Sequence, residues 1–428
     1  MHKSVGEPVG ARLSDRGLLI LLCGLNTLNF VDRNLLSSFA NFLKPELRLT
    51  DAQYGLLTGL VFLVFYAVAG LFMGALADRT NRPRLIAAAT LVWSLLTAAS
   101  GAARGFLSLA APRALIGVGE SALSPAALSL LADRISPDRL GLAAAVYYLG
   151  VPIGAGASLL IAGYLGPTVG WRGCFYALGA IGLLMGGLML LEREPRPRRV
   201  EGDAPRPPFG AQFRRLLAVL RQSPALVATV VGGVFLHIAI GAAQFDQLWF
   251  TAERGFERAE IARLTGYITV AVGIVGSLFG GFAGDWWRRR MRSERPMLLF
   301  ALMLVTLPLI VAYRLAPPES PIFFIGVGAV VFQLAACYGP TFATIQQLAP
   351  PDARATVTAF YILCLNVVGL GIGITGTGWA VDALRAAGAA QPYTVAILAF
   401  TGLSVFAIPA FFLAGVWSRQ SSVEECAA

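Results

Sequence analysis

The sequence predicts an all-α membrane protein with twelve transmembrane helices, arranged as two pseudo-symmetric six-helix bundles. Three observations support this: the composition, the length and spacing of the apolar segments, and an internal repeat. Hydrophobic residues make up 56% of the 428 positions and charged residues only 14%, whereas a soluble domain carries about 25% charged residues. Too few charged residues are present to cover a water-facing surface, so the apolar residues belong to membrane spans.

A helix needs about twenty mostly apolar residues to cross the ~30 Å hydrocarbon layer of a bilayer. Twelve segments meet this requirement. The predicted spans are 17–37, 54–76, 84–103, 107–132, 140–165, 172–191, 224–248, 262–284, 296–315, 321–348, 354–381 and 392–417. The first span follows a short polar segment and is too long for the apolar part of a cleavable signal peptide. We therefore expect it to act as its own insertion signal.

Motifs recur at an offset of about half the chain. The matched pairs are Asp78 with Asp285, Ser124-Pro125 with Gly339-Pro340, and Pro137-Asp138 with Pro351-Asp352, at offsets of 207, 215 and 214 residues. Parallel repeats of six spans, with the substrate site near the midplane between them, form a large class of transporters. The predicted parts are an N-terminal segment (1–16), an N-terminal bundle (17–191), a linker (192–222), a C-terminal bundle (223–417) and a tail (418–428).

The distribution of basic residues predicts the orientation. Of the 34 lysines and arginines, 23 fall on the side of the N-terminus, 9 on the other side and 2 inside spans. The linker alone carries eight arginines. Basic residues gather on the cytoplasmic side, so both termini are expected in the cytoplasm. Thirty-two arginines against two lysines are typical of a GC-rich bacterium, and we expect the inner (cell) membrane to be the location.

The sequence argues against other function classes. Its net charge of +10 does not indicate nucleic-acid binding, because the basic residues sit in short loops without a basic face. Five cysteines (Cys23, Cys174, Cys337, Cys364 and Cys426) lack metal or CxxC spacing. The run from Gly371 to Gly376 matches GxGxxG but lies inside an apolar span. No Walker A, GxSxG or HExxH motif occurs. We therefore predict no enzyme activity, no cofactor and no metal.

Four charged residues inside spans are the main candidates for a functional site. Asp32 and Arg33 lie well inside span one, and Arg113 and Glu120 lie seven residues apart on one face of span four. A charge at mid-span costs about 2.5–3.5 kcal/mol on the mildest scale, so such side chains face a bundle interior or a wet cavity. Span one runs outward and span four inward, which places the four residues at overlapping depths.

These residues predict a switch that responds to protons. Desolvation favours the neutral form of a carboxylate, and a nearby arginine favours the charged form, so protonation would make or break an arginine contact. Glu120 is the predicted proton carrier and Asp32 its partner. Arg33 and Arg113 are predicted counter-charges or anchors for an anionic substrate. A static charge network that fixes helix register is the alternative.

The loop after span two has the composition of a cytoplasmic latch between the halves. An acid at a helix end followed by arginines can pair with neighbouring helix ends. The predicted latch residues are Gly74, Asp78, Arg79 and Arg82, with Asp285 and Arg288 as their repeat. The alternative is that these basic residues only set the topology.

Two further sets of residues are open to two interpretations each. Span five carries Gly141, Gly150, Pro152, Gly154 and Gly156, which permit either a bend used in transport or static close packing. The second half carries polar and aromatic residues that either line a cavity or bond to a neighbouring helix. These are His237, Gln333, Tyr338, Tyr361 and Asn366. Gln244 and Asp246 are expected too near the outer surface to take part.

The same motifs resemble a known family. The segment GALADRTNRPR (74–84) and the twelve spans resemble the major facilitator superfamily over the whole chain. Asn29–Arg33 resembles the NYxDR signature of its Spinster branch, Arg113–Ser121 resembles RxLxGxGEA, and Gly170-Trp171-Arg172 also fits. Phe30, Ser121 and the position of Pro152 depart from the pattern.

The resemblance implies a secondary active transporter that works by alternating access. It implies proton coupling and an amphipathic substrate similar to a lysophospholipid or sphingolipid, with Asp32, Arg33, Arg113 and Glu120 matching the charge cluster of the branch. A carrier of organic anions or drugs is the alternative within the superfamily. A lipid-modifying enzyme and a non-transporting sensor are the alternatives outside it. Partners are the substrate, protons and the bilayer, and we expect a monomer.

Overall fold

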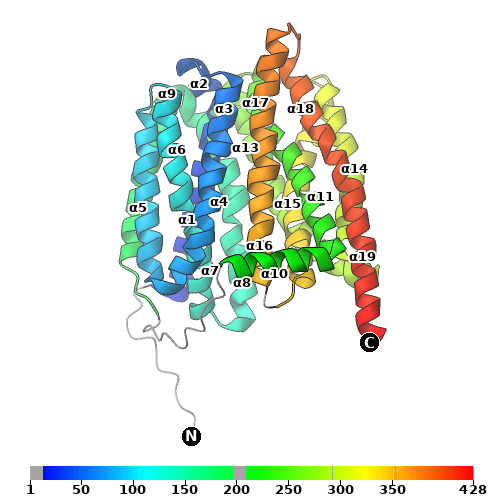
Figure 1. Ribbon diagram of the computed structural model, residues 1–428. Coiled ribbons are helices and arrows are strands. Elements are labelled where there is room, and N and C mark those ends of the chain that lie inside the picture. The colour runs from blue at the N-terminus through cyan, green and yellow to red at the C-terminus, as the bar shows by residue number, and fades with distance from the viewer. Residues whose placement is uncertain (1–12, 196–208, 292, 352, 428) are drawn as a thin grey trace.

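The computed structural model describes residues 13–195, 209–291, 293–351 and 353–427. All regular secondary structure in these ranges is helical. Most helices run side by side along one long axis, and α10 lies across them near one end (Figure 1). This arrangement confirms the predicted all-α architecture.

The first half holds nine helical segments. They are α1 (Asp15–Ser38), α2 (Ala40–Glu46), α3 (Asp51–Thr58), α4 (Leu60–Arg79), α5 (Arg82–Gly101), α6 (Phe106–Glu120), α7 (Leu123–Arg134), α8 (Pro137–Tyr148) and α9 (Gly150–Leu190). Local sequence explains where several begin. Thr50 caps α3 in a reciprocal capping box with Gln53, and Asn81 caps α5 ahead of Pro83, because these side chains satisfy free backbone N–H groups.

The second half continues from α10. Its segments are α10 (Phe209–Gln222), α11 (Pro224–Ala242), η1 (Ala243–Phe245), α12 (Asp246–Ala252), α13 (Arg258–Arg290), α14 (Arg295–Leu315), α15 (Pro321–Leu348), α16 (Arg354–Leu363), the π-helical η2 (Cys364–Leu370), α17 (Gly371–Ala386), α18 (Pro392–Leu403), η3 (Ser404–Phe406) and α19 (Ala407–Ala427). The π-helical segment interrupts the eleventh predicted span, and π-bulges of this kind often occur at functional sites.

Ten helical stretches within the described ranges are long and apolar enough to span a membrane. One of them, Arg139–Leu190, contains both the fifth and the sixth predicted spans, and its backbone leaves the helical conformation at Gly170 (φ 74°). α1 covers the first predicted span but is not among the ten. Its apolar run is interrupted by Asn26, Asn29, Asp32 and Arg33, which lower its hydropathy.

The two halves are in backbone contact toward the end that carries α2 and the start of α3. A Cβ atom built on Gly156 of α9 would lie 2.8 Å from the carbonyl oxygen of Gly266 in α13. A Cβ atom on Gly55 of α3 would lie 3.0 Å from the carbonyl oxygen of Ile374 in α17. Small residues at both places let the helices approach this closely, so this end of the molecule is closed between the halves.

The opposite end carries α10, the α7–α8 turn and the C-terminal part of α19 (Figure 1). α10 packs on α11 and α16 of the second half through Leu216 and Val219. The predicted N-terminal segment lies almost wholly outside the described residues, as does the middle of the linker, 196–208. The predicted boundaries between the parts therefore stay predictions.

Candidate functional site

The four charged residues singled out in spans one and four lie together inside the first half. Asp32, Arg113 and Glu120 are buried, and the side chain of Arg33 keeps 20% of its surface exposed. Asp32 and Arg33 come from α1, whereas Arg113 and Glu120 come from α6. We call these four residues the charge cluster.

Arg33 and Glu120 form the ion pair of the charge cluster. Arg33 Nε donates to Glu120 Oε2 at 3.1 Å. The guanidinium of Arg33 also lies over the ring of Tyr66, 4.2 Å from its centroid. Glu120 Oε1 is buried and has no hydrogen-bond partner. A buried oxygen without a partner is costly for a carboxylate, so the second oxygen of Glu120 is available to a proton or another donor.

Asp32 and Arg113 are held by different contacts. Thr97 of α5 donates its hydroxyl hydrogen to the carboxylate of Asp32. Arg113 donates to the backbone carbonyls of Asp32 at 3.4 Å and of Arg33 at 2.9 Å, and its guanidinium lies 4.5 Å from the ring centroid of Phe62. Arg113 therefore ties α6 to the backbone of α1 at the residues that carry Asp32 and Arg33.

Sequence reasoning missed the residues that complete this site. Thr97, Phe62 and Tyr66 hold the side chains of the charge cluster, but threonine and aromatic residues are common in spans and carry no special signal there. Asn29 Nδ2 and Asn26 Oδ1 are also buried without hydrogen-bond partners. Asn29 begins the segment that resembles the NYxDR signature, and Asn26 lies one helical turn before it in α1.

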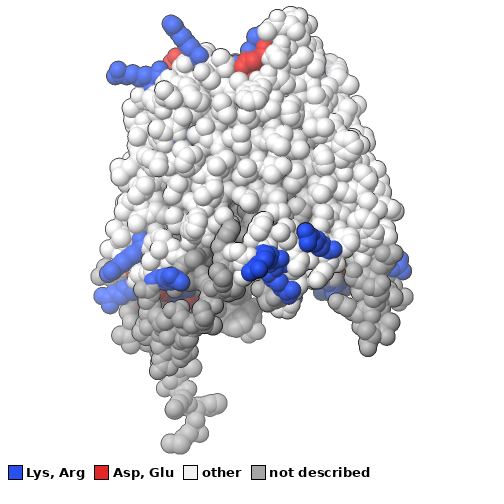
Figure 2. Space-filling model, viewed as in Figure 1, with Lys and Arg blue, Asp and Glu red and all other residues white. Residues whose placement is uncertain are grey.

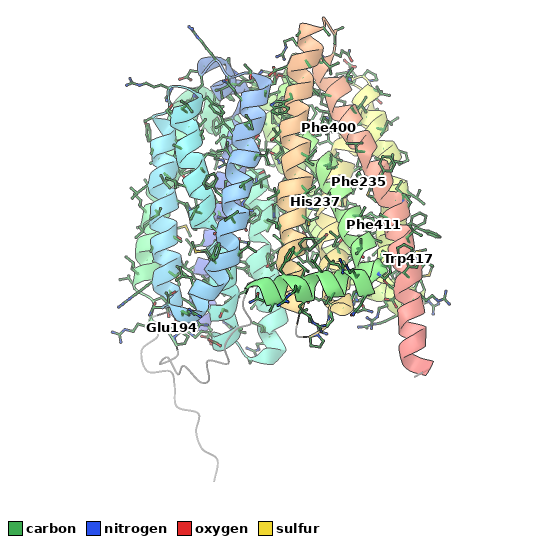
Figure 3. The ribbon with its side chains drawn as sticks, in the orientation of Figure 1. Glu194, Phe235, His237, Phe400, Phe411 and Trp417 are labelled. Atoms are coloured by element: carbon green, nitrogen blue, oxygen red, sulfur yellow. The ribbon has the colours of Figure 1, made fainter. Side chains whose placement is uncertain are left out.

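Tyr338 of α15 belongs to an aromatic group in the second half. Its ring stacks on Phe342 with the centroids 6.2 Å apart. His237 of α11, labelled in Figure 3, has Nε2 3.3 Å from the Tyr338 hydroxyl and Nδ1 2.8 Å from the carbonyl oxygen of Gly233. His237 therefore helps to hold the Tyr338 hydroxyl in place.

The other candidates of the second half differ in placement. Tyr361 is buried and packs edge-on against Phe342. Asn366 lies in the π-helical segment and donates to the carbonyl of Ile362 at 2.9 Å. Gln333 donates to Thr306 at 2.6 Å inside the bundle, which is the helix-bonding interpretation of that residue.

The predicted latch residues contact partners within their own halves in this conformation. Arg82 pairs with Asp133 at 2.6 Å and with Glu194, which lies near the α10 end of the molecule (Figure 3). Arg79 is exposed, Gly74 has open space beside it, and the side chain of Asp78 is not among those described. In the second half Asp285 pairs with Arg295 at 2.9 Å.

Arg288 completes the latch set, and it donates to Gln347 at 3.2 Å. All of these described contacts stay inside one half. A latch between the halves therefore remains a prediction for another conformation of the protein.

The structure places Asp246, which we expected too near the outer surface to take part, in an ion pair. It pairs with Arg314 of α14 at 2.6 Å, and the side chain of Arg314 is 1% exposed. A cavity of about 20 Å³ lies beside Arg314 and is also lined by Gln333, Thr401 and Ser404.

The closed end is held by a polar network between the halves that the sequence did not reveal. Asp51 of α3 is fully buried and contacts Arg385 of α17 at 2.5 Å, Tyr393 of α18 at 2.7 Å and Lys44 of α2 at 2.8 Å. Asp382 accepts from the backbone N–H of Asp51 at 3.1 Å. We call these five residues the closing network.

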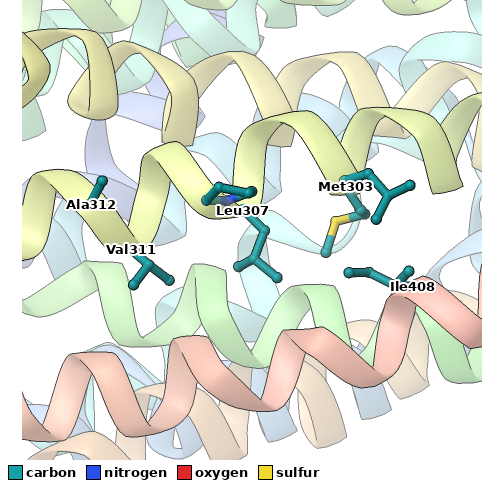
Figure 4. A pocket seen from close by; sticks show the side chains of 7 residues that line it. Met303, Leu307, Val311, Ala312 and Ile408 are labelled. Atoms are coloured by element: carbon teal, nitrogen blue, oxygen red, sulfur yellow. The ribbon is translucent and has the colours of Figure 1, made fainter.

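A further cavity lies elsewhere and has no polar anchor. It is an apolar groove of about 440 Å³ between α14 and α19, with Met303, Leu307, Val311 and Ile408 in its lining (Figure 4). Because specific ligand sites combine apolar walls with a few placed polar groups, we do not assign the substrate site to this groove. No group of three or more metal-binding side chains occurs among the described residues.

The comparisons with known proteins support the fold and the family. The family model of the Major Facilitator Superfamily matches residues 22–374. An MFS-type efflux pump of Mycolicibacterium smegmatis is 29% identical over 95% of this chain and 94% of its own length. The protein spinster of Drosophila melanogaster is 24% identical over 84% of this chain, which spans only 62% of the fly protein.

A solved structure gives the same overall arrangement. It is the crystal structure of a bacterial homologue of the human lysosomal transporter Spinster, in an inward-facing and unoccupied conformation. The TM-score is 0.82 at 24% identity, and the match covers 95% of this chain and 98% of that one. The chain therefore belongs to the major facilitator superfamily of membrane transporters, and its predicted resemblance to the Spinster branch is confirmed.

Proposed function

We propose that the protein is a proton-coupled secondary active transporter of an amphipathic molecule similar to a lysophospholipid or sphingolipid, which it moves by alternating access. The observation that carries this proposal is the buried Arg33–Glu120 ion pair with Glu120 Oε1 unpartnered. A buried carboxylate with one free oxygen has room for a proton and has a basic partner that responds to it.

Protonation of Glu120 changes the contact with Arg33. Protonation removes the negative charge of Glu120 and with it the Coulomb attraction to the Arg33 guanidinium, so a neutral Glu120 holds Arg33 less tightly. Arg33 is the partly exposed member of the charge cluster and can then bind an anionic group of the substrate. Arg113 holds the α1 backbone at Asp32 and Arg33, so α1 and α6 respond together. The proton thereby biases which conformation is preferred.

The surroundings of Arg33 suit an amphipathic substrate. Phe30, Phe62 and Tyr66 surround the guanidinium at 4.2–5.3 Å. Tyr338 and Phe342 present stacked rings from the second half. An anionic head group would pair with Arg33, and an apolar chain would lie against these rings. The similarity to spinster proteins supports a transporter of that branch.

A carrier of organic anions or drugs is the second candidate. The similarity to an efflux pump over nearly the full length of both proteins favours it, and an arginine among aromatic rings also binds flat anionic drugs. Thermal stabilisation of the purified protein by a lysolipid panel, compared with sugar acids and drugs, separates the two candidates. Stabilisation by the sugar acids or drugs alone would contradict the lipid proposal.

The topology belongs to the same proposal. The α10 end carries the linker and the C-terminal helix. We place the protein in a bacterial inner membrane with this end facing the cytoplasm. The closed end then faces outward, and the conformation is inward-facing. Labelling of cysteines introduced at Arg104 and Arg214 with an impermeant reagent on intact cells tests this. Labelling at position 214 without labelling at position 104 would show that the orientation is the opposite of the proposed one.

The decisive experiment measures flux in proteoliposomes with and without an imposed pH difference. Glu120→Gln breaks the buried pair with Arg33, so it should fold with a lowered melting temperature and should lose the response of flux to the pH difference. Asp246→Asn/Arg314→Met, which removes a buried ion pair in the other half, is the matched control and should keep that response. Full proton-dependent transport by Glu120→Gln would refute the assignment.

A further inference from the structure

The helix α10 has a sequence suited to a charged interface. Its fourteen residues, FGAQFRRLLAVLRQ, contain three arginines and no acidic residue. At 100° per residue, the large apolar residues fall within about 160° and form one side of the helix. They are Phe213, Leu216, Leu217, Val219 and Leu220. Arg214 and Arg221 lie seven residues apart and therefore project from the same edge of that apolar side.

The protein covers only one part of this apolar side. Leu216 and Val219 are 5% and 2% exposed and pack into the cluster formed by α11 and α16. Phe213 and Leu217, which lie nearer to Arg214 and Arg221 around the helix, are 49% and 37% exposed. An apolar strip bordered by two exposed arginines is therefore left open.

The orientation of α10 places this strip where a bilayer surface would meet it. The helix lies across the spans at the end where they terminate (Figure 1). Basic side chains, and no acidic ones, are visible over this part of the surface (Figure 2). A helix in this position with an apolar face and bordering arginines has the character of an interfacial helix, whose binding combines apolar burial with attraction to anionic lipids.

We propose that Phe213, Arg214, Leu217 and Arg221 form a binding site for an anionic phospholipid of the surrounding membrane. The guanidinium groups of Arg214 and Arg221 would bind the phosphate oxygens of the head group, and Phe213 and Leu217 would contact the upper part of the acyl chains. The absence of acidic residues from α10 means that no opposite charge on the helix competes for the arginines. This site is separate from the charge cluster and does not depend on the proposed transport reaction.

The position of the site gives the bound lipid an effect on the protein. α10 packs on α16, which leads directly into the π-helical segment η2 of the same span. A lipid that fixes α10 at the membrane surface would hold this end of the second half, where α10 packs on α11 and α16.

The test is a thermal-stability titration of the purified, full-length protein in neutral detergent with phosphatidylglycerol, and with phosphatidylcholine as the zwitterionic lipid. Each basic residue near an anionic surface is expected to change affinity about five-fold. The titration midpoint of Arg214→Gln/Arg221→Gln should therefore rise by roughly twenty-five-fold. Arg289→Gln/Arg290→Gln removes two exposed arginines at the end of α13 and is the matched control, with an expected change under about two-fold.

Two outcomes would overturn the proposal. Equal loss in both double variants would mean that the surface charge as a whole attracts the lipid, and unchanged binding in Arg214→Gln/Arg221→Gln would mean that α10 does not bind it. Glycerol phosphate, which has the head-group chemistry without chains, should compete poorly, and competition equal to that of the lipid would remove the role of Phe213 and Leu217. Because the substituted side chains are exposed, folding should be kept, and the melting temperature without lipid checks this.

Discussion

The close contact between α9 and α13 can be tested by adding one methyl group at Gly156. The test shows whether this contact belongs to only one conformation of the protein. A Cβ atom on Gly156 would lie 2.8 Å from the carbonyl oxygen of Gly266 and 3.0 Å from the backbone nitrogen of Val270. These are backbone atoms of the other half and cannot rotate away. Gly156→Ala therefore obstructs the closed arrangement and has no such effect once the halves separate at this end.

The expected shift follows from the cost of overpacking. An added methylene in a well-packed place costs about 1–3 kcal/mol, which is a change of roughly 5- to 150-fold in an equilibrium constant. Because Gly156 contacts the other half, the added methyl group destabilises the conformation that is closed at this end relative to the open one. Gly154 is the matched control, because its added Cβ would lie 2.7 Å from Phe30 Cβ and 3.1 Å from the nitrogen of Val31, inside the first half. There the same cost lowers the stability of the fold.

The assay is a pulsed spin-label distance measurement across the closed end. Labels on Arg104→Cys and Glu319→Cys, after replacement of the native cysteines, report from exposed loops of the two halves. Gly156→Ala should raise the population of long distances. Gly154→Ala should leave the distances unchanged and lower the melting temperature. An unchanged distribution in Gly156→Ala, or an equal shift in both variants, would refute the reasoning.

Two further predictions concern the ends of the bundles. Glu46 accepts from Trp171 Nε1 at 2.6 Å and from Arg172 Nε at 2.9 Å, and the Trp171 hydrogen bond, followed by that of Arg172, lowers the pKa of Glu46. The contribution of Glu46 to stability is present above the ordinary glutamate pKa and is lost as pH falls through its lowered pKa. The melting temperatures of wild type and Glu46→Gln should therefore differ slightly at neutral pH, and this difference should disappear in acid. Asp246→Asn should lower the melting temperature markedly, whereas Asp246→Asn/Arg314→Met should recover most of the loss.

The sequence was sufficient for the architecture because membrane insertion leaves few alternatives. Apolar segments of span length must become helices, and charges at mid-span must face inward, so Asp32 and Glu120 could be placed near each other without coordinates. The sixth span was found from the length of its apolar segment, and the repeat was found from matched motifs. The break at Gly170 and the split of span two at Gly59 were not predicted, because a single glycine inside an apolar run carries no distinct signal.

The partners of the charged residues could not be predicted for a different reason. The hydrogen bond from Thr97 to Asp32 and the contact of Asp51 with Arg385 join residues 65 and 334 positions apart. Only the relative rotation of packed helices brings them together, and periodicity alone does not fix that rotation to within one side chain. Long-range polar contacts were therefore the part of the site that required the structure.

Asp32 and Asp246 are acidic residues in different halves of the protein, and the difference between their partners explains why the two halves should behave differently. Asp32 has a neutral partner in Thr97, whereas Asp246 has a buried arginine at 2.6 Å that stacks on Trp249. Removing one member of a buried ion pair costs about 3–5 kcal/mol, but replacing both is often neutral.

That rule shows whether the Asp246–Arg314 ion pair only stabilises the fold or also takes part in proton coupling. Arg314 Nε and Nη1 have no hydrogen-bond partner even with Asp246 ionised. Loss of the Asp246 charge therefore leaves the buried guanidinium without a counter-charge. If the pair serves only stability, Asp246→Asn/Arg314→Met restores the melting temperature and flux keeps its response to the pH difference. A double variant that is stable and has lost this response would show that the second half also carries a proton, and the charge cluster would then account for only part of the coupling.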